Sequence, residues 1–296
     1  MTPRICLGTA QFGLTYGITN SSGQVSEQEV RALLSKANEA RISFIDTAQS
    51  YGNAESILGQ SMPLDHDFQL VCKLRAQKKV EFTEADFTNW EEEFRASCDR
   101  LGLKQINSML LHSAKDLKKP GGHFLLQWLQ DLRTRGLVQR IGLSIYSADD
   151  LAGVDLAALD LVQLPFSLYD QRLLRDGTLF QLSQNGIAIH ARSVFLQGLL
   201  LTPTCDWPTW VDSKILHHHH QLEALALKRG CTLVNLALGF AQSQKYLEAV
   251  VFGVCSSREL SELLDAWKEI SPWQEDEWLK WQILDPSSLD PRRWPS

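Results

Sequence analysis

Short apolar runs alternate with amphipathic stretches from one end of the chain to the other. Eight apolar runs predict strands, at residues 5–8, 44–46, 70–73, 108–112, 140–144, 161–163, 188–193 and 250–253. The stretches between them have a helical character, at 27–40, 55–59, 87–101, 124–135, from 148, 178–185, 221–228 with 234–244, and 258–267. Strands separated by helices pair in parallel through crossover connections, and eight such units close naturally into a barrel. The pattern therefore predicts the α/β class and a (β/α)8, or TIM, barrel.

Local signals support several of the predicted helix boundaries. Ser26 precedes the stretch at 27–40, and Glu29 stands three places later, which is the capping-box pattern of a helix start. Glycines fall just past four helical stretches, where a left-handed residue commonly ends a helix, at Gly102, Gly136, Gly186 and Gly230. We therefore expect helices to begin and end near these residues.

An open, doubly wound sheet is the competing architecture. Such a sheet carries a G-x-G-x-x-G turn after its first strand. Here the first strand is followed by GTAQFG, from Gly8 to Gly13, which has the wrong spacing and predicts no immediate helix. No Pro- or Ser-rich linker, low-complexity block or clear repeat divides the chain. We expect one barrel domain over residues 1–296, with an irregular tail rich in Trp and Pro from about residue 271.

Length and composition agree with a barrel and disfavour several other classes of protein. The chain has 296 residues, against about 250 for a typical (β/α)8 barrel. The net charge of −6 and the pI of 5.8 argue against nucleic acid or an anionic membrane as the partner. No apolar run approaches the roughly 20 residues of a membrane span, and no signal-peptide pattern opens the sequence. The six cysteines include no Cys-x-x-Cys pair and several lie in apolar runs, so we expect a cytoplasmic enzyme.

Polar residues follow three successive predicted strands at the point where each strand ends. Asp46 ends the second strand, Tyr51 follows in its loop, Lys73 ends the third strand and His112 ends the fourth. The carboxyl ends of barrel strands converge on one mouth, where these side chains would meet. Each residue alone has an ordinary structural interpretation, as a loop cap, a packed aromatic, a snorkelling lysine or a core histidine. Their occurrence together favours catalysis.

This combination suits proton donation to a carbonyl group. A free tyrosine has a pKa near 10, and a lysine cation beside the phenol would lower that pKa. The carboxylate would hold the lysine in place, and the imidazole would orient the carbonyl oxygen or share in the proton transfer. Because no side chain can supply hydride, a cofactor must do so.

The segment DTAQSYGNAESILG, from Asp46 to Gly59, resembles the signature of the aldo-keto reductase family. The resemblance extends from Gly8 to about Trp267. It implies a barrel oxidoreductase that uses NADPH, with Tyr51 as general acid. Asp46, Tyr51, Lys73 and His112 would form the catalytic tetrad of that family.

The resemblance also implies a set of cofactor contacts at the barrel mouth. Ser144 and Gln163 would meet the nicotinamide amide, although Ile145 replaces the usual asparagine beside Ser144. Arg192 stands where many members stack an aromatic ring on the nicotinamide; a guanidinium can also stack on a planar ring, or it could bind phosphate or pair with an acid. The full set of expected cofactor contacts is Gly8, Thr9, Ala10, Asp46, Ser144, Gln163, Arg192, Ser193, Gly198, Leu200, Gly253, Ser256, Arg258 and Glu262.

The last members of that set come from the segment after the eighth strand. Residues 251–258 resemble the phosphate and adenosine segment of the family, and backbone amides at the following helix start suit a phosphate. Arg258 would read a 2′-phosphate. Glu262 would meet adenine, or remain a solvated helix residue, and Leu263 replaces the usual asparagine next to it.

Aromatic and histidine-rich segments of the C-terminal half leave alternatives open. The loop at 202–216, with Trp207 and Trp210, could fold over cofactor or substrate. Tail tryptophans could wall the pocket or seal a barrel end, and these are Trp273, Trp278, Trp281 and Trp294. The run His217–His220 is expected at a solvent-facing helix start without a metal, because consecutive helix residues point about 100° apart and no nearby Cys or acid completes a zinc set.

The leading functional hypothesis is the reduction of an aldehyde or ketone by NADPH, with Tyr51 protonating the oxygen. One alternative is a subunit that binds NADPH as a sensor and turns over little. A third, weaker hypothesis is a lyase or isomerase that uses Lys73 as a Schiff-base amine. Segments 8–13 and 289–294 resemble bacterial reductases associated with surface-polysaccharide synthesis, which suggests a sugar-derived small-molecule substrate. We expect a monomer or a small homo-oligomer.

Overall fold

The computed structural model describes residues 2–270, 273–283, 285 and 289–294. Within this part of the chain, eight parallel strands form a closed barrel in which each strand pairs with its neighbours in sequence and β1 pairs with β8. The strands are β1 (Arg4–Gly8), β2 (Phe44–Asp46), β3 (Gln69–Leu74), β4 (Ile106–Leu111), β5 (Val138–Ser144), β6 (Leu161–Pro165), β7 (Ala188–Arg192) and β8 (Ala249–Gly253). All eight predicted strands are confirmed, and with them the (β/α)8 class.

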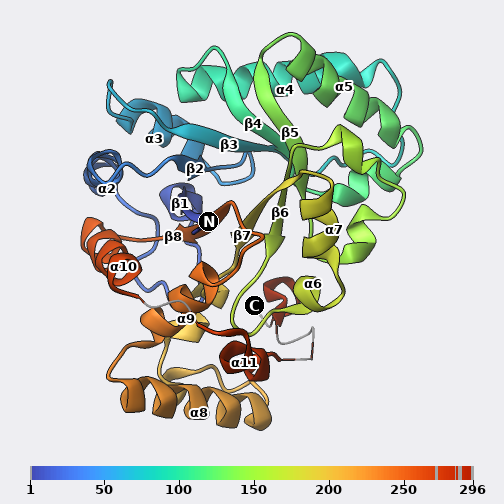
Figure 1. Cartoon of the computed structure of the whole chain (residues 1–296). Coiled ribbons are helices and arrows are strands. Elements are labelled where there is room, and N and C mark those ends of the chain that lie inside the picture. Colours follow the sequence, from blue (N-terminus) through green and yellow to red (C-terminus); the bar gives the residue numbers. More distant parts are fainter. Residues whose placement is uncertain (1, 271–272, 284, 286–288, 295–296) are drawn as a thin grey trace.

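Helices surround the barrel (Figure 1). They are α1 (Ala10–Gly13), α2 (Glu27–Glu39), α3 (Ala54–Ser61), α4 (Asp86–Leu101), α5 (Gly122–Thr134), α6 (Arg172–Arg175), α7 (Thr178–Gln184), α8 (Ser213–Arg229), α9 (Leu233–Gln242), α10 (Ser257–Glu269) and α11 (Glu275–Trp278). Two expectations were wrong. A single helical turn, α1, follows β1 directly, and α8 begins eight residues before the predicted start at 221.

The barrel interior explains why polar residues gather at one end. Seven buried residues fill the inside of the barrel: Cys6, Phe44, Val71, Leu110, Leu161, Ala249 and Val251. Side chains alternate along a strand, so the residue two places further along faces the same side. Four of the seven are followed two places later by a polar residue at the barrel mouth, and these polar residues are Asp46, Lys73, His112 and Gln163. The strand period therefore aims these four side chains into one space.

The helix ends predicted at four glycines and the helix start predicted at Ser26 are confirmed, but the predicted capping box is not. The four glycines after helical stretches all adopt positive φ, with values of 68°, 72°, 71° and 64° in chain order. The Ser26 side chain caps α2 by accepting a hydrogen bond from the Glu29 amide at 3.3 Å. The Glu29 carboxylate, however, accepts from the amide of Ser257 on α10 rather than closing a capping box with Ser26. A carboxylate thus links the start of α2 to the start of α10.

The histidine run lies inside α8, and its environment differs from the prediction. His217 and His220 are exposed, as expected, but His219 is fully buried. Its ring bridges the Tyr169 hydroxyl at 2.8 Å and the carbonyl oxygen of Thr202 at 2.9 Å. The expectation of a wholly solvent-facing run was therefore wrong, because α8 packs this face on the barrel. Across the described residues, no group of three His, Cys, Asp or Glu side chains is placed to hold a metal ion.

The tail contains short helical turns where the sequence predicted irregular structure. Helix α11 lies beside α8 (Figure 1), and Arg229 pairs with Glu277 across this contact at 2.5 Å. Trp278 is buried against Phe240 of α9, with 5.4 Å between ring centroids. These contacts place the Trp278 part of the tail outside the barrel. In the described chain no single helix is long and apolar enough to cross a membrane; the pair α8 and α9, bent by 92°, meets that criterion only when the two are joined, by length and composition alone.

Candidate active site

A buried ion pair between Asp46 on β2 and Lys73 on β3 lies at the base of the mouth. The Lys73 ammonium donates to Asp46 Oδ1 at 2.6 Å and to the carbonyl oxygen of Thr47 at 3.0 Å. Lys73 has no exposed surface. Burial lowers the pKa of this ammonium, but Asp46 and Tyr51 raise it, and the resulting pKa lies above the ordinary value. The lysine is therefore charged and fixed behind the carboxylate.

Tyr51 lies in the loop after β2, with its ring between Lys73 and His112. Lys73 Nζ is 5.3 Å from the centre of the Tyr51 ring, and the His112 ring meets it edge-on with centroids 5.8 Å apart. Burial raises the pKa of Tyr51 to about 12, although the Lys73 charge acts in the lowering direction. The sequence predicted the lowering effect of Lys73 but not that burial would outweigh it. Tyr51 consequently keeps its proton at neutral pH.

His112 follows β4 directly and faces the same space. Its Nδ1 lies 3.0 Å from the Ser50 hydroxyl. Burial, together with the Lys73 charge, lowers the pKa of this imidazole to about 4. His112 is therefore neutral at physiological pH. In the tautomer in which the Ser50 hydroxyl donates to Nδ1, Nε2 carries the proton and can donate a hydrogen bond to a ligand.

These side chains border a cavity of about 490 Å³ at the carboxyl ends of the strands. The residues predicted from the sequence that line it are Gly8, Thr9, Ala10, Asp46, Tyr51, His112, Ser144, Gln163, Arg192, Ser193, Gly198 and Gly253. Lys73 lies behind Asp46 instead. The predicted residues Leu200, Ser256, Arg258 and Glu262 are not part of the lining.

Two loops, residues 14–24 after α1 and 193–202 after β7, meet over the cavity. Thr19 Oγ1 donates to the carbonyl oxygen of Gln197 at 3.3 Å. Gly198 has a φ of +96°, and a Cβ at this position would lie 2.0 Å from Thr19 Oγ1. Only glycine fits here, because any side chain would meet both backbone strain and a steric clash.

The floor of the cavity carries an unsatisfied amide oxygen. Gln163 on β6 is fully buried; its Nε2 donates to Asp46 Oδ1 at 2.7 Å, while its Oε1 has no partner. Ser144, at the end of β5, pairs in register with Gln163. A buried acceptor without a donor is costly, and a ligand amide group would satisfy it. This pair of residues fits the carboxamide of a nicotinamide ring.

Arg192 ends β7 and forms part of the cavity wall. Its Nη2 donates to the carbonyl oxygen of Ile145 at 3.0 Å, and its guanidinium carbon lies 4.0 Å from the centre of the Tyr146 ring. Arg292, in the tail, packs on the same ring at 3.3 Å. The planar guanidinium thus stacks on a protein ring, and Ile145 contributes its carbonyl oxygen.

The far end of the cavity is bordered by the segment that leads into α10. Cys255 and Glu259 line the cavity there. Arg258 and Glu262 do not, since their side chains are 86% and 69% exposed and lie 3.7 Å from each other. The predicted roles of these two residues in reading phosphate and adenine would therefore be played on the surface of α10, outside the cavity.

Three backbone amides at the start of α10 already have acceptors, those of Cys255, Ser257 and Glu259. Glu259 Oε2 accepts from the Cys255 amide at 2.7 Å, and Ser256 Oγ accepts from the Glu259 amide at 3.1 Å. Glu29 Oε1 accepts from the Ser257 amide at 2.5 Å, and this hydrogen bond lowers the pKa of the Glu29 carboxyl. Two of these three acceptors are carboxylates, which leaves this helix start poorly suited to a further anion.

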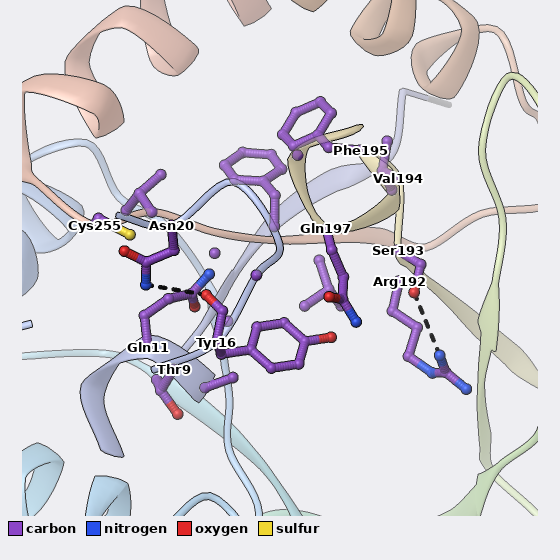
Figure 2. A pocket seen from close by; sticks show the side chains of 18 of the residues that line it. Thr9, Gln11, Tyr16, Asn20, Arg192, Ser193, Val194, Phe195, Gln197 and Cys255 are labelled. Atoms are coloured by element: carbon purple, nitrogen blue, oxygen red, sulfur yellow. Dashed lines mark hydrogen bonds between the residues drawn. The ribbon is translucent and has the colours of Figure 1, made fainter. Parts of the chain in front are cut away.

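Several lining residues were missed by the sequence analysis. Tyr16, from the loop at 14–24, points toward Gln197 and Arg192 across the cavity (Figure 2). Tyr146 and Glu259 also border it. The polar loop between β1 and α2 is long enough to reach the mouth, which was the available signal for Tyr16; no pattern in the sequence distinguishes Glu259 from the neighbouring Arg258.

The loop at 202–216 and its tryptophans border a different space. Trp207 Nε1 donates to the carbonyl oxygen of Thr202 at 2.8 Å, and its ring packs on His219 at 4.4 Å between centroids. Trp207, Trp210 and Trp294 line a second cavity of about 320 Å³, whose lining includes neither Tyr51 nor His112. This loop therefore covers a neighbouring part of the barrel.

Comparison with known proteins agrees with this architecture. The aldo/keto reductase family model matches residues 4–285. The NADH-specific methylglyoxal reductase of Escherichia coli is 25% identical over 291 residues, with 88% of each chain covered. An aldo-keto reductase of Mycobacterium avium is 32% identical over 136 residues, 44% of each chain.

Solved structures of this fold are also similar. An aldo-keto reductase from Bacillus halodurans in its holo form matches with a TM-score of 0.75 at 18% identity, covering 99% of this chain and 95% of that one. The glycerol dehydrogenase of Gluconobacter oxydans matches with a TM-score of 0.69 at 20% identity, covering 94% and 90%. The match of the family model over nearly the whole chain shows that this protein belongs to the aldo/keto reductase family.

Proposed function

We propose that this protein reduces an aldehyde or ketone to an alcohol, taking hydride from a reduced nicotinamide dinucleotide and a proton from Tyr51. The observation that carries the proposal is the combination of a protonated tyrosine, a neutral imidazole and an orphaned carboxamide acceptor on one cavity. A bound reduced nicotinamide would supply hydride to the carbonyl carbon, which no side chain can do.

The chain's own residues would manage the carbonyl oxygen. Tyr51 is neutral in the resting site and donates its proton as negative charge develops on the oxygen. Lys73, held 5.3 Å from the ring centre, stabilises the phenolate left behind. Asp46 keeps Lys73 in place, and neutral His112 orients the carbonyl through a hydrogen bond from Nε2.

Ser144 and Gln163 would hold the nicotinamide carboxamide. The free Oε1 of Gln163 would accept a hydrogen bond from the NH2 group of the nicotinamide carboxamide. The register pairing of β5 with β6 keeps Ser144 and Gln163 adjacent. Six of the other expected contacts line the cavity that the rest of the dinucleotide would occupy between Gln163 and α10: Gly8, Thr9, Ala10, Ser193, Gly198 and Gly253.

The sequence resemblance predicts NADPH, but the start of α10 favours NADH. A 2′-phosphate at this end of the cavity would approach the carboxylates of Glu259 and Glu29, whereas a free ribose hydroxyl can donate to a carboxylate, as it does in NAD-binding folds. The similarity to a reductase named NADH-specific is in agreement. We therefore propose NADH as the preferred form.

Titration of protein fluorescence with each dinucleotide tests this preference. Wild-type protein should bind NADH more tightly than NADPH, and Glu259→Gln should move the ratio of the two Kd values about tenfold toward NADPH, which corresponds to about 1.4 kcal/mol. Asp265→Asn is the matched control, because Asp265 is an exposed residue of α10 that pairs with Lys268 on the same helix. A wild-type preference for NADPH would refute the choice of NADH.

Two other functions remain as alternatives from the sequence, and the geometry favours neither. A nucleotide sensor with little turnover has no use for a tyrosine, lysine and histidine arranged for proton transfer. A Schiff-base enzyme needs an accessible neutral amine, whereas Lys73 is fully buried, hydrogen-bonded to Asp46 and has a raised pKa.

The central experiment measures oxidation of NADH by a panel of carbonyl compounds. Wild-type protein should turn over, and Tyr51→Phe should lower kcat at least about 100-fold, the scale of a positioned acid, while NADH binding persists. Full activity in Tyr51→Phe would exclude this tyrosine as the proton donor. Borohydride trapping of a substrate on Lys73 would favour the Schiff-base alternative.

A further inference from the structure

One cation on the cavity wall has no counter-ion. The charged residues that line the described cavity are Asp46, Arg192 and Glu259. Asp46 is already bound to Lys73, and Glu259 lies at the far end of the cavity, in the first turn of α10. None of the ion pairs formed by the described residues includes Arg192. The catalytic end of the cavity therefore carries one uncompensated positive charge.

Arg192 is held in place by neutral groups, which leaves part of its hydrogen-bonding capacity unused. One N–H group donates to the carbonyl oxygen of Ile145, and another lies 3.4 Å from the Ser193 hydroxyl. A guanidinium has five N–H donors, so three remain. Stacking on Tyr146 fixes the plane of the fork without neutralising it. A rigid, unpaired fork is the arrangement that suits a carboxylate or phosphate group.

Arg292, packed on the same Tyr146 ring, provides an internal comparison. Its guanidinium forms two hydrogen bonds with the Asp290 carboxylate, at 2.8 and 2.6 Å. Of the two arginines on this ring, one is therefore neutralised by a protein carboxylate, and the one inside the cavity is not. The missing counter-ion of Arg192 belongs to something that enters the cavity.

The position of Arg192 indicates which ligand brings that anion. Arg192 lines the same cavity as Tyr51 and His112, and its guanidinium is held at the end of β7 by the carbonyl oxygen of Ile145. Its charge acts in the lowering direction on the pKa values of both residues, although burial is the larger cause for each, so it lies near the groups that hold the reacting carbonyl rather than at the α10 end. Hydride transfer also leaves a positive charge on the nicotinamide ring, which a bare guanidinium nearby would oppose. An anionic group on the substrate offsets both charges.

We propose that the natural substrate is a carbonyl compound that also bears a carboxylate or phosphate group, and that Arg192 binds this group. The proposal rests on the carbonyl reduction proposed above. It makes Arg192 a substrate-specificity residue, beyond the nicotinamide-stacking role that the sequence resemblance implied. A sugar-derived substrate remains compatible if it is a sugar acid or a sugar phosphate.

Matched aldehydes test the proposal with NADH saturating. For the carboxylate arm, 4-carboxybenzaldehyde is compared with its neutral methyl ester, and for the phosphate arm, glyceraldehyde 3-phosphate is compared with glyceraldehyde. Wild-type kcat/KM should favour the anionic member of at least one pair about 30- to 100-fold, mainly through KM. The arm with the larger ratio identifies the anion.

Variants separate binding of the anion from general damage. In Arg192→Gln the anionic-to-neutral ratio should fall to about 1–3, and Arg192→Lys should retain part of it because the charge remains. Arg292→Gln removes the paired arginine from the same ring and should keep the wild-type ratio. Wild-type ratios near 1 in both arms would overturn the proposal, as would an unchanged ratio in Arg192→Gln.

A binding measurement distinguishes failure of this inference from failure of the proposed function. Calorimetric titration with 4-carboxybenzyl alcohol should detect binding to the wild-type complex with NAD⁺ and at least tenfold weaker binding to Arg192→Gln. If no aldehyde is reduced but this difference persists, the catalytic proposal fails and the anion site stands. If Arg192→Gln instead weakens NADH binding tenfold with the substrate ratio intact, Arg192 serves the cofactor and the inference is wrong.

Discussion

Lys73→Met tests the buried ion pair that underlies the site. The substitution keeps an unbranched side chain one atom shorter but leaves the Asp46 carboxylate, 3% exposed, without its cation. Breaking a buried pair by removing one partner typically costs about 3–5 kcal/mol. The hydrogen bond from Gln163 Nε2 to Asp46 Oδ1 persists and partly solvates the carboxylate, so the lower end, about 3 kcal/mol, is expected.

Urea unfolding followed by tryptophan fluorescence measures this loss. Thermal unfolding provides a second measure: at about 2–4 °C per kcal/mol, the melting temperature of Lys73→Met should fall by about 6–12 °C. In the double variant Asp46→Asn/Lys73→Met no buried charge is stranded, so its free energy of unfolding should exceed that of Lys73→Met by about 1–2 kcal/mol. Arg95→Met, which breaks an exposed pair with Glu91, is the control and should cost about 0.5 kcal/mol or less. Additive losses in the double variant would refute the coupling of Asp46 with Lys73.

Four further predictions concern other parts of the structure. Because burial lowers the pKa of His112 to about 4, kcat/KM for a neutral aldehyde should show no His112 ionisation between pH 5.5 and 9; an ionisation near 6.5 that disappears in His112→Gln would contradict this. The same lowered pKa means that the unfolded chain binds more protons than the folded protein between about pH 4 and 6.5, so His112 should make stability fall as pH drops through this window, more in wild type than in His112→Gln. Gly198→Ala should separate the loops joined by Thr19 and Gln197 and weaken dinucleotide binding at least about fivefold, whereas Gly153→Ala, whose glycine also has positive φ but open space around it, should leave the dinucleotide Kd unchanged. Tyr169→Phe should cost about 1–3 kcal/mol in urea unfolding by leaving buried His219 without its hydroxyl partner, and a loss under about 0.5 kcal/mol would show that this hydrogen bond contributes little.

The pattern of apolar and polar residues predicted most of the fold, because each strand can be recognised from a few consecutive residues. All eight strands were found, since each is a short apolar run bounded by polar residues, and the polar residue at the end of β2, β3 or β4 lies in the mouth for the same reason. Boundaries failed where tertiary packing decides them. Helix α8 extends back to Ser213 through the histidine run. The buried side chain of His219 fixes this part of the helix to Tyr169 and Thr202, and no spacing rule indicates that contact.

The sequence predicted which residues form the catalytic end of the site, but it did not predict their pKa values or all of their side-chain directions. The sequence placed a lysine beside Tyr51 and so predicted a lowered pKa, yet burial dominates and raises it to about 12. At α10 the sequence drew attention to Arg258, while the structure turns that side chain outward and Glu259 inward. Solvation and side-chain direction depend on the assembled barrel, so they are not encoded in motif spacing.

The hydrogen bond between Gln163 and Asp46 has a stereochemical consequence. By donating from Nε2 to Asp46, Gln163 is left with its carbonyl oxygen as the only side-chain group that can meet a carboxamide. If a nicotinamide is anchored in that single orientation, as proposed above, it would turn one face of its ring toward Tyr51 and the other toward the protein. Only one of the two prochiral hydrogens at C4 should therefore be transferred. The carboxylate that positions Lys73 would, through one amide, also select the transferred hydrogen atom.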